Sequence, residues 1–438
     1  MQQQNPLRAL PSVNELLQDE RLVPLEAEYG HDLAVEAARE AIDAARERVA
    51  AGGQPEDIAA DAVDILQGSA APRLRRVLNA TGIVVHTNLG RAPLAPEALE
   101  RIQEVAAGYS NLEYGLAEGG RGSRQEHVAP LLRGLTGAED ALVVNNNAAA
   151  VFLAIAALAE GRDVLVSRGE LVEIGDGFRI PEMLARSGAR LVEVGTTNRT
   201  RLDDYERALG ERSAVLLRVH PSNFRVVGFT ERPELAELAR LADERGLVLV
   251  DDLGSGVMMD LGDEPTVDES LHAGAHVVTF SGDKLFGGPQ AGLVLGRAAL
   301  VERLRRHPLQ RALRADKLTI AALEGTLALY RSGRGGPPVL RMLTEPATAV
   351  RTRAERLAEL TGGKVEATVA RAGGGSLPIT DLESFACALE ESLAEPLRRA
   401  DPPVIGIVRD GVLLLDCRTL GDEEVEEAAR AVNACRSR

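Results

Sequence analysis

A lysine that directly follows an apolar run lies in the most informative stretch of this sequence. Ser281 and Asp283 precede Lys284, and a pair of glycines follows at positions 287–288. The run His276–Phe280 predicts a strand, which places the lysine at the mouth of a sheet, beside glycines that let a ligand approach the backbone. An ammonium group in a partly desolvated pocket has a lowered pKa and can act as a nucleophilic amine. The alternative is a solvated surface lysine beside a glycine-rich turn.

A pair of carboxylates follows a second apolar run, Leu247–Val250. A lysine and a carboxylate at strand ends suit pyridoxal 5′-phosphate (PLP), because Lys284 can carry the cofactor as a Schiff base while an anion beside the pyridine nitrogen makes the ring a better electron sink. Asp251 is our choice for that anion, since it comes first after the expected strand, and Asp252 is the alternative. The simpler interpretation is a pair of capping carboxylates.

A polar turn between an expected strand and an expected helix could hold the cofactor's phosphate. Asn145, Asn146, Asn147 and Ala148 stand where Ala141–Val144 ends and a helix begins. Free backbone N–H groups and the helix dipole make such a turn an anion site, although asparagine is also a common cap. At the end of another expected strand, His220 and Asn223 could meet the cofactor's ring oxygen, and the alternative is a turn histidine.

Three stretches place arginines where an oxyanion could be held. Arg91 follows the apolar run Ile83–Val85, Arg121 and Arg124 share a glycine-rich loop, and two further arginines stand three apart, on one face if helical: Arg311 and Arg314. Converging guanidinium groups suit a phosphate-like anion. Each stretch taken alone can equally be a solvated arginine face.

The elements that must position these residues alternate between strands and helices. Seven strands are expected, at Ala141–Val144, Asp163–Val166, Leu191–Val194, Ala214–Val219, Leu247–Val250, His276–Phe280 and Gly292–Leu295. Such alternation predicts an α/β fold with a mostly parallel seven-stranded sheet, whose ligands bind at the carboxyl ends of the strands.

Four segments follow from this pattern. Residues 1–70 are expected to form an acidic helical domain, with 14 Asp and Glu against 5 Arg, and 71–100 to form a linker segment. Residues 101–335 are expected to form the large PLP-binding domain. Residues 336–438 are expected to form a small α+β domain with a long helix at Val339–Leu360, strands at Lys364–Val369, Val404–Val408 and Val412–Leu415, and a final helix.

Composition restricts the classes of function. A net charge of −16 argues against broad nucleic-acid binding through a basic surface. The 3 cysteines form no metal-ligand pattern, and no apolar run approaches the ~18 residues of a membrane span. No secretory signal is visible, so we expect a cytoplasmic protein without a metal or a membrane partner.

Taken together, these motifs identify a resemblance. The sequence resembles the bacterial selenocysteine synthases, L-seryl-tRNA(Sec) selenium transferases, along nearly its whole length. The stretches that carry it are Leu7–Val13, Asn79–Arg91, Tyr109–Tyr114, Arg121–Arg124, His220–Asn223, Asp251–Gly256, Ser281–Lys284, His307–Lys317 and Leu415–Leu420.

The resemblance implies a fold-type I PLP enzyme that assembles as a homodecamer. It implies conversion of L-seryl-tRNA(Sec) to selenocysteinyl-tRNA(Sec) with selenophosphate, through a PLP-bound dehydroalanyl-tRNA. Lys284 would take the Cα proton, with Asp283 as proton donor or orienting group and Ser281 among the cofactor's contacts. Selenophosphate would be held by Arg91, Arg311 and Arg314, and cofactor or substrate by Arg121 or Arg124. The N-terminal domain would grip the tRNA, although its acidity leaves few basic points for this, such as Arg73–Arg76.

Two other classes of protein compete with this interpretation. A PLP-dependent ammonia-lyase of the same superfamily, acting on a small amino or sugar acid, would keep Lys284 and Asp251 but need no RNA-binding domain. A non-catalytic interaction protein could retain the fold. The helical N-terminal extension and Arg311 with Arg314 favour the tRNA enzyme, and the intact lysine, carboxylate and arginine set argues against the non-catalytic protein.

Overall fold

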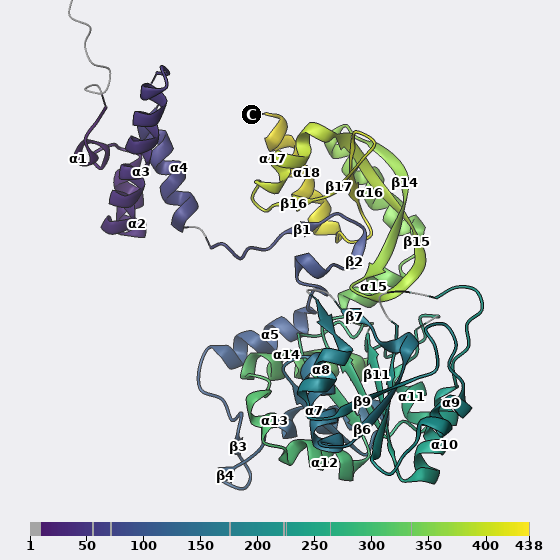
Figure 1. The fold of residues 1–438 in the computed structure, drawn as a ribbon. Coiled ribbons are helices and arrows are strands. Elements are labelled where there is room, and N and C mark those ends of the chain that lie inside the picture. Colours follow the sequence, from purple (N-terminus) through teal and green to yellow (C-terminus); the bar gives the residue numbers. More distant parts are fainter. Residues whose placement is uncertain are drawn as a thin grey trace, which may run out of the picture. The chain divides into compact units, whose positions relative to one another are not determined.

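The chain forms two compact units, residues 1–76 and 77–438 (Figure 1). The computed structural model describes residues 10–437 apart from 55–56, 71, 175–176, 222–223, 225, 263 and 334.

The N-terminal unit is helical in its described part. Its helices are α1 (Val13–Leu16), α2 (Leu22–Tyr29), α3 (His31–Ala50) and α4 (Ile58–Ala70). The long α3 buries mostly alanines, which allow neighbouring helices to approach closely, and Leu22 and Leu66 fill the core between them. Ser12 begins α1 with a capping box in which its hydroxyl and the Glu15 carboxylate each accept a backbone N–H.

A seven-stranded sheet organises the second unit and contains all seven predicted strands. Its order is β5 (Asp140–Val144), β13 (Gly292–Gly296), β12 (Val277–Ser281), β11 (Val248–Gly254), β10 (Ser213–Val219), β6 (Asp163–Ser167) and β9 (Arg190–Val194). Only β13 runs antiparallel to its neighbours. The strands are nearly all buried on both faces, as expected for a mostly parallel sheet between helices.

Helices cover both faces of this sheet. The apolar cluster on one face contains residues of α7 (Asn147–Ala159), α8 (Ile180–Arg186) and α12 (Ala298–Arg306), together with Val250 of β11 and Val277 of β12. On the other face Leu249 packs with α9 (Leu202–Ala208) and α10 (Leu235–Arg245), and Val278 packs with α6 (Ala129–Thr136), α11 (Val267–His272) and α14 (Lys317–Ser332). Successive residues of a strand therefore face different helices.

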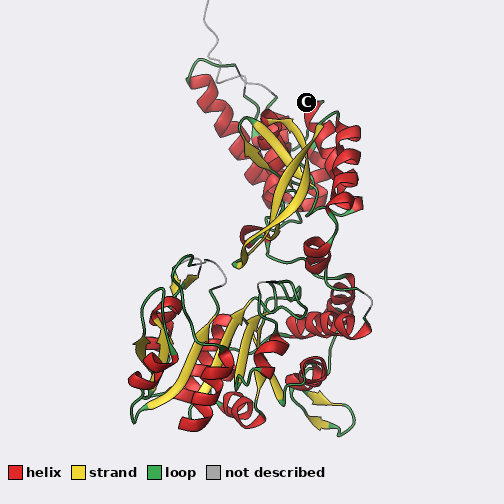
Figure 2. Ribbon diagram, turned by 90° about the vertical axis from the view of Figure 1, so that its right-hand side faces the viewer, coloured by secondary structure: helices red, strands yellow, loops and turns green. Residues whose placement is uncertain are grey.

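The C-terminal part of this unit has its own five-stranded sheet, ordered β17 (Ile407–Arg409), β18 (Val412–Asp416), β15 (Ser376–Glu390), β14 (Lys364–Gly373) and β2 (Ile83–Val85). The long twisted ribbon of β14 and β15 is visible in Figure 2. Helices α16 (Ala347–Thr361) and α18 (Asp422–Arg436) bury leucines and valines against it. Residues 71–100, expected as a linker, contribute β2 to this sheet and β1 (Leu78–Asn79), which pairs with β16 (Val404–Ile405).

Two details differ from the expected elements. The helix expected at Val339–Leu360 is two helices, α15 (Pro338–Thr344) and α16, because Pro346 stands between them and ends the first. The fifteen-residue strand β15 was not predicted, since its Ala, Leu and Glu residues are typical of a helix and conceal the alternation of Phe385, Cys387 and Leu389.

Candidate active site

Lys284 lies in the turn that follows β12. The residue is only 7% exposed, and burial lowers the pKa of its ammonium, with the positive charge of Arg91 lowering it further. The carboxylates of Asp252, Asp283 and Glu264 act in the opposite direction. Ser281, the last residue of β12, is also buried. A lysine in this environment more readily holds a neutral, nucleophilic amine than one at the surface.

Asp252 shares this region with Lys284. Its Oδ1 accepts a hydrogen bond from Asn147 Nδ2 at 2.8 Å and from Thr279 Oγ1 at 3.2 Å. Burial raises the pKa of its carboxyl, while the Asn147 hydrogen bond and the charge of Lys284 oppose the rise. Val250, Thr279 and Asp252 lie on the face of the sheet that α7 covers.

Asp251 lies on the opposite face. It interacts with the Ser270 hydroxyl of α11 and with the charge of Arg218, and burial raises its pKa. The reason for preferring Asp251 as the ring carboxylate does not hold, because β11 does not end at Val250 but continues to Gly254. Inside a strand, neighbouring side chains point to opposite faces, and of the two carboxylates it is Asp252 that shares a face with Asn147 and feels Lys284.

The polar turn after β5 begins α7. Asn146 is the N-cap, and its side-chain oxygen accepts the Ala149 N–H at 2.8 Å. The Asn145 N–H donates a hydrogen bond to the Leu313 carbonyl at 2.9 Å. Asn147 and Ala148 stand in the first turn, where backbone N–H groups have no acceptor within the helix and attract anions.

These residues fit a bound PLP. Besides a buried lysine, a facing carboxylate and a helix N-terminus, the site contains a buried acceptor, Asn147 Oδ1, that has no hydrogen-bond partner among the described residues. Buried polar atoms are normally paired, so an acceptor left open here is consistent with a group that the polypeptide itself does not supply.

Arg91 pairs with Asp283, the residue before Lys284. Its Nη1 lies 3.0 Å from Oδ1 and 3.1 Å from Oδ2, and the Ala92 N–H donates to the Asp283 carbonyl at 3.2 Å. Arg91 has φ of 66°, a left-handed conformation that is uncommon for a residue with a side chain. Such backbone strain is found where the surrounding structure fixes a functional group.

A second group of arginines gathers around Glu113, which was not predicted. Its Oε1 accepts Arg124 Nη2 at 2.5 Å and Arg314 Nη1 at 2.9 Å, and its Oε2 lies 4.0 Å from Arg121. The hydrogen bonds from Arg124 hold the pKa of the Glu113 carboxyl below its usual range. Arg311 touches this group only through its carbonyl, which accepts Arg314 Nε at 3.3 Å. Arg314 also pairs with Val144, directly before the polar turn.

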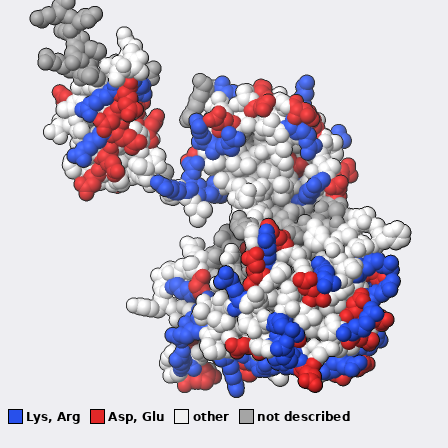
Figure 3. Space-filling view, in the orientation of Figure 1, with Lys and Arg blue, Asp and Glu red and all other residues white. Residues whose placement is uncertain are grey.

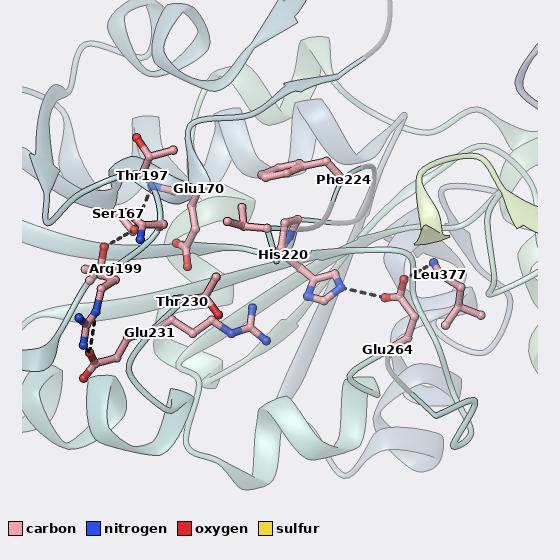
Figure 4. A pocket seen from close by; sticks show the side chains of 16 residues that line it. Ser167, Glu170, Thr197, Arg199, His220, Phe224, Thr230, Glu231, Glu264 and Leu377 are labelled. Carbon is pink, nitrogen blue, oxygen red and sulfur yellow. Dashed lines mark hydrogen bonds and ion pairs between the residues drawn. The ribbon is translucent and has the colours of Figure 1, made fainter. Parts of the chain in front are cut away.

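A cavity of about 460 Å³ lies at the carboxyl ends of β6, β9 and β10 (Figure 4). His220 stands in its wall, with Nε2 at 3.1 Å from Glu264 Oε2, and Leu377 of β15 donates its backbone N–H to Glu264 Oε1 at 2.6 Å. Glu264 was not predicted, because nothing in its loop sequence marks it as a contact of His220. Asn223 lies outside the described residues.

Beside the cavity, Glu170 and Arg218 form a buried ion pair at 3.2 Å. Glu170 Oε2 also accepts the Val219 N–H at 3.2 Å, and Arg218 Nη1 donates to the Pro233 carbonyl at 2.8 Å. Burial raises the pKa of Glu170 to about 7, although the charge of Arg218 lowers it. This group occupies the same face of the sheet as Asp251.

Comparison with known proteins decides the family. A family model described as L-seryl-tRNA selenium transferase matches residues 77–421, and one described as the selenocysteine synthase N terminal matches residues 7–46. The chain belongs to the L-seryl-tRNA selenium transferase family. Proteins named L-seryl-tRNA(Sec) selenium transferase match it closely, for example those of Moorella thermoacetica, 47% identical over 99% of this chain and 97% of that protein, and Carboxydothermus hydrogenoformans, 45% identical over 97% and 96%.

The fold of this selenium transferase family member also resembles a solved structure. D-glucosaminate-6-phosphate ammonia-lyase superposes with a TM-score of 0.60 at 20% identity, over 83% of this chain and 96% of that one. At this identity the likeness concerns the fold alone, and it confirms the predicted α/β fold-type I class. Over the part of the chain that the structure describes, no helix has the length and apolarity needed to cross a membrane, and no cluster of His, Cys, Asp or Glu could hold a metal ion.

Proposed function

We propose that this protein converts L-seryl-tRNA(Sec) to selenocysteinyl-tRNA(Sec), with selenophosphate as the selenium donor and PLP carried on Lys284. The observation that carries the proposal is the family match over both units of the chain, 7–46 and 77–421, in a protein that buries Lys284 beside Asp252. An ammonia-lyase would need the second unit only. The ammonia-lyase shares the fold at 20% identity, whereas the selenium transferase of Carboxydothermus hydrogenoformans is 45% identical over 97% of the chain.

The cofactor site would be built from three elements. Lys284 and Ser281 come from β12 and its turn, Asp252 from β11, and the phosphate site from the first turn of α7 with Asn145, Asn146, Asn147 and Ala148. Asp252 rather than Asp251 would face the ring nitrogen, since it shares a face with Asn147 and Thr279. His220 and Asn223 remain candidates for the ring oxygen. When bound, PLP supplies an electron sink for the charge left at Cα when a seryl group loses its proton.

Lys284 would move that proton. Its lowered pKa favours a neutral amine, which is the form that can accept a proton from Cα. Asp283 would orient its surroundings rather than donate a proton, because both of its carboxylate oxygens already accept hydrogen bonds from Arg91. The backbone hydrogen bond from Ala92 to the Asp283 carbonyl would help to hold this pair beside the lysine.

Selenophosphate would be held by Arg91, Arg311 and Arg314, with Arg121 and Arg124 supporting cofactor or substrate. Guanidinium groups bind phosphate-like anions through paired hydrogen bonds. In the free protein, Asp283 is the counter-ion of Arg91, and Glu113 is the counter-ion of Arg124 and Arg314. These carboxylates would hold the arginines in place before the anion binds. The incoming anion would then compete with the carboxylates for the guanidinium groups.

The N-terminal unit would bind the tRNA, and the protein would act in the cytoplasm as a homodecamer. On the face shown in Figure 3, acidic side chains form a band across this unit with basic ones beside it. Among the described residues of this unit, Arg21 forms an ion pair with Asp57, Arg46 with Asp43, and Arg48 with Asp61. The grip on RNA would therefore depend on shape more than on charge.

Single-turnover assays with seryl-tRNA(Sec) and selenophosphate test this proposal. The purified protein should absorb visible light, and borohydride should link the cofactor to Lys284. Lys284→Ala should abolish selenium transfer, whereas the exposed Lys364→Ala serves as a control with unchanged transfer. Activity on free serine with none on the charged tRNA would favour the ammonia-lyase class, and a colourless protein without a borohydride adduct would exclude PLP.

A further inference from the structure

The cavity beside His220 is larger than the cofactor groups account for. Its volume of about 460 Å³ falls within the range of small-molecule sites. Among the described residues assigned above to cofactor and selenophosphate, His220 alone stands in its wall. The remaining wall comes from the ends of β6 and β9, from Glu264, from Leu377 of β15, and from Pro221, Phe224, Val226, Thr230, Glu231 and Arg232. The cavity has room for a small molecule.

The cavity contains a cation without a counter-ion in contact. Arg232 lines both this cavity and a smaller one of about 180 Å³ behind it. Among the described residues its guanidinium has neither a hydrogen bond nor an ion pair, and the residue is exposed to solvent. The surrounding protein lowers its pKa, first by desolvation and then through the charge of Arg218. An anion placed in the cavity would relieve both effects.

The rest of the wall suits a flat, polar ring system. Phe224 lies on one side of the cavity in Figure 4, with Arg199 and Glu231 on another. Glu231 holds the Arg199 guanidinium at 2.5 Å, which fixes a planar group at the wall. Asn198 donates to the Phe229 carbonyl at 2.6 Å, and its side-chain oxygen accepts no hydrogen bond from any residue that the structure describes. Unstacked bases of RNA ends are bound by aromatic rings and guanidinium planes and by hydrogen bonds to their edges.

A short chain of contacts connects this cavity to the reactive lysine. Glu264 contacts His220 in the wall and accepts a hydrogen bond from Ser255 Oγ at 3.1 Å. The Ser255 carbonyl in turn accepts the Leu285 N–H at 3.1 Å, one residue beyond Lys284. Glu264 is also among the carboxylates that raise the pKa of Lys284. Glu264 thus links the wall of the cavity to the surroundings of Lys284.

We propose that the cavity binds the 3′-terminal adenosine nucleotide of the charged tRNA, with its 5′-phosphate against Arg232. This inference rests on the proposed function. In an aminoacyl-tRNA the amino acid is esterified to the ribose of the terminal adenosine, so the nucleotide must lie one short ester away from the amine that meets Lys284. The cavity provides the required position, volume and charge.

Binding of adenosine 5′-monophosphate to the holoenzyme tests the site without any selenium chemistry. Arg232→Met should weaken this binding about tenfold or more, the loss expected for one charge-assisted contact with a phosphate. Arg201→Met is the matched control, because Arg201 also pairs with Glu231, at 3.1 Å, yet does not line the cavity. Equal binding in both variants and the unmodified protein would overturn the inference, as would equally tight binding of inorganic phosphate alone.

Kinetics and crosslinking locate the nucleotide in the working enzyme. Arg232→Met should raise the KM for seryl-tRNA about tenfold while kcat changes by less than about threefold, since the arginine contacts a part of the substrate remote from the reacting atoms. Arg232→Lys, which keeps the charge, should recover part of the loss. A tRNA ending in 8-azidoadenosine should label the segment 197–232. Efficient labelling elsewhere would overturn the inference, whereas absent selenium transfer by the unmodified protein would refute the proposed function instead.

Discussion

The two faces of β11 carry the same chemical group and give it different surroundings. Asp251 and Asp252 are neighbours in one strand, and both are buried. On the α7 face Asp252 meets Asn147, Thr279 and the charge of Lys284. On the α11 face Asp251 meets Ser270 and the charge of Arg218.

The difference teaches that the face, and not the order along the chain, decides the role of each carboxylate. On the Asp251 face Arg218 is already paired with Glu170 and bound to the Pro233 carbonyl. On the Asp252 face, among the described residues, Asn147 has an open acceptor and Lys284 a buried amine. We therefore assign the role beside the lysine to Asp252 and a supporting role to Asp251.

The largest expected effect separates the two carboxylates directly. Asp252→Asn should lower selenium transfer on the order of 10³-fold, because the site loses the fixed charge that, in the proposed function, would face the cofactor ring. Asp251→Asn should leave transfer within about threefold, since its partners do not touch the lysine. Single-turnover rates with seryl-tRNA(Sec), together with the visible absorption of each variant, provide the measurement. A larger loss in Asp251→Asn than in Asp252→Asn, with both proteins folded, would reverse the assignment.

The second expected effect is a pH dependence of stability on the Asp251 face. The folded state raises the pKa of Glu170 to about 7, from 4.5 in the unfolded chain, so between these values it binds more protons than the unfolded state. Stability must therefore fall as the pH rises through this window. Glu170→Gln removes the titration, and at pH 8 it should be more stable than the unmodified protein by about 3 kcal/mol.

Denaturant unfolding at pH 5 and pH 8 measures this difference. At pH 5 the two proteins should have nearly equal free energies of unfolding, because Glu170 then carries its proton and resembles glutamine. A variant that loses stability at pH 8 would mean that the charged Glu170–Arg218 pair stabilises the fold there.

Most of the large sheet that carries the two carboxylates could be predicted from the sequence. All seven strands of the large sheet were predicted, because buried parallel strands are continuous apolar runs between turns. The lysine and the asparagine turn could be found for the same reason, since both directly follow such runs. The end of β11 could not be predicted, because Asp251 and Asp252 are polar residues that continue the strand inside the protein.

Contacts between distant loops were beyond prediction. Glu113 forms ion pairs with Arg124 and Arg314, which lie far from one another or from it in the sequence. Glu264 likewise contacts His220 and accepts a hydrogen bond from the backbone of Leu377. Such contacts form only when the chain folds. The local sequences around Glu113 and Glu264 contain no spacing that would distinguish them from solvated carboxylates. By contrast, the break between α15 and α16 was predictable, because Pro346 disfavours a continuous helix. The prediction of a single helix across this proline was wrong.

The smallest expected effect, on stability and rate, comes from removing one of two hydroxyls. One interacts with Asp251 and the other with Asp252, on opposite faces of the sheet. Ser270→Ala removes the hydroxyl that interacts with Asp251, and Thr279→Val removes the donor to Asp252 at 3.2 Å while keeping the shape of the side chain. Each change should lower the free energy of unfolding by about 1 kcal/mol, the usual value for one hydrogen bond. Thr279→Val should also slow selenium transfer by about threefold to tenfold, because Asp252 would be held by Asn147 alone.

Thermal unfolding and single-turnover rates measured on the same two variants separate stability from activity. If Ser270→Ala loses stability only, and Thr279→Val loses both, then the hydrogen bonds on the two faces have equal strength but different consequences. Equal effects of the two variants on the rate would mean that the faces are coupled through the strand. In that case the division between a supporting carboxylate and one that acts beside the lysine would fail even if Asp252→Asn alone behaved as expected.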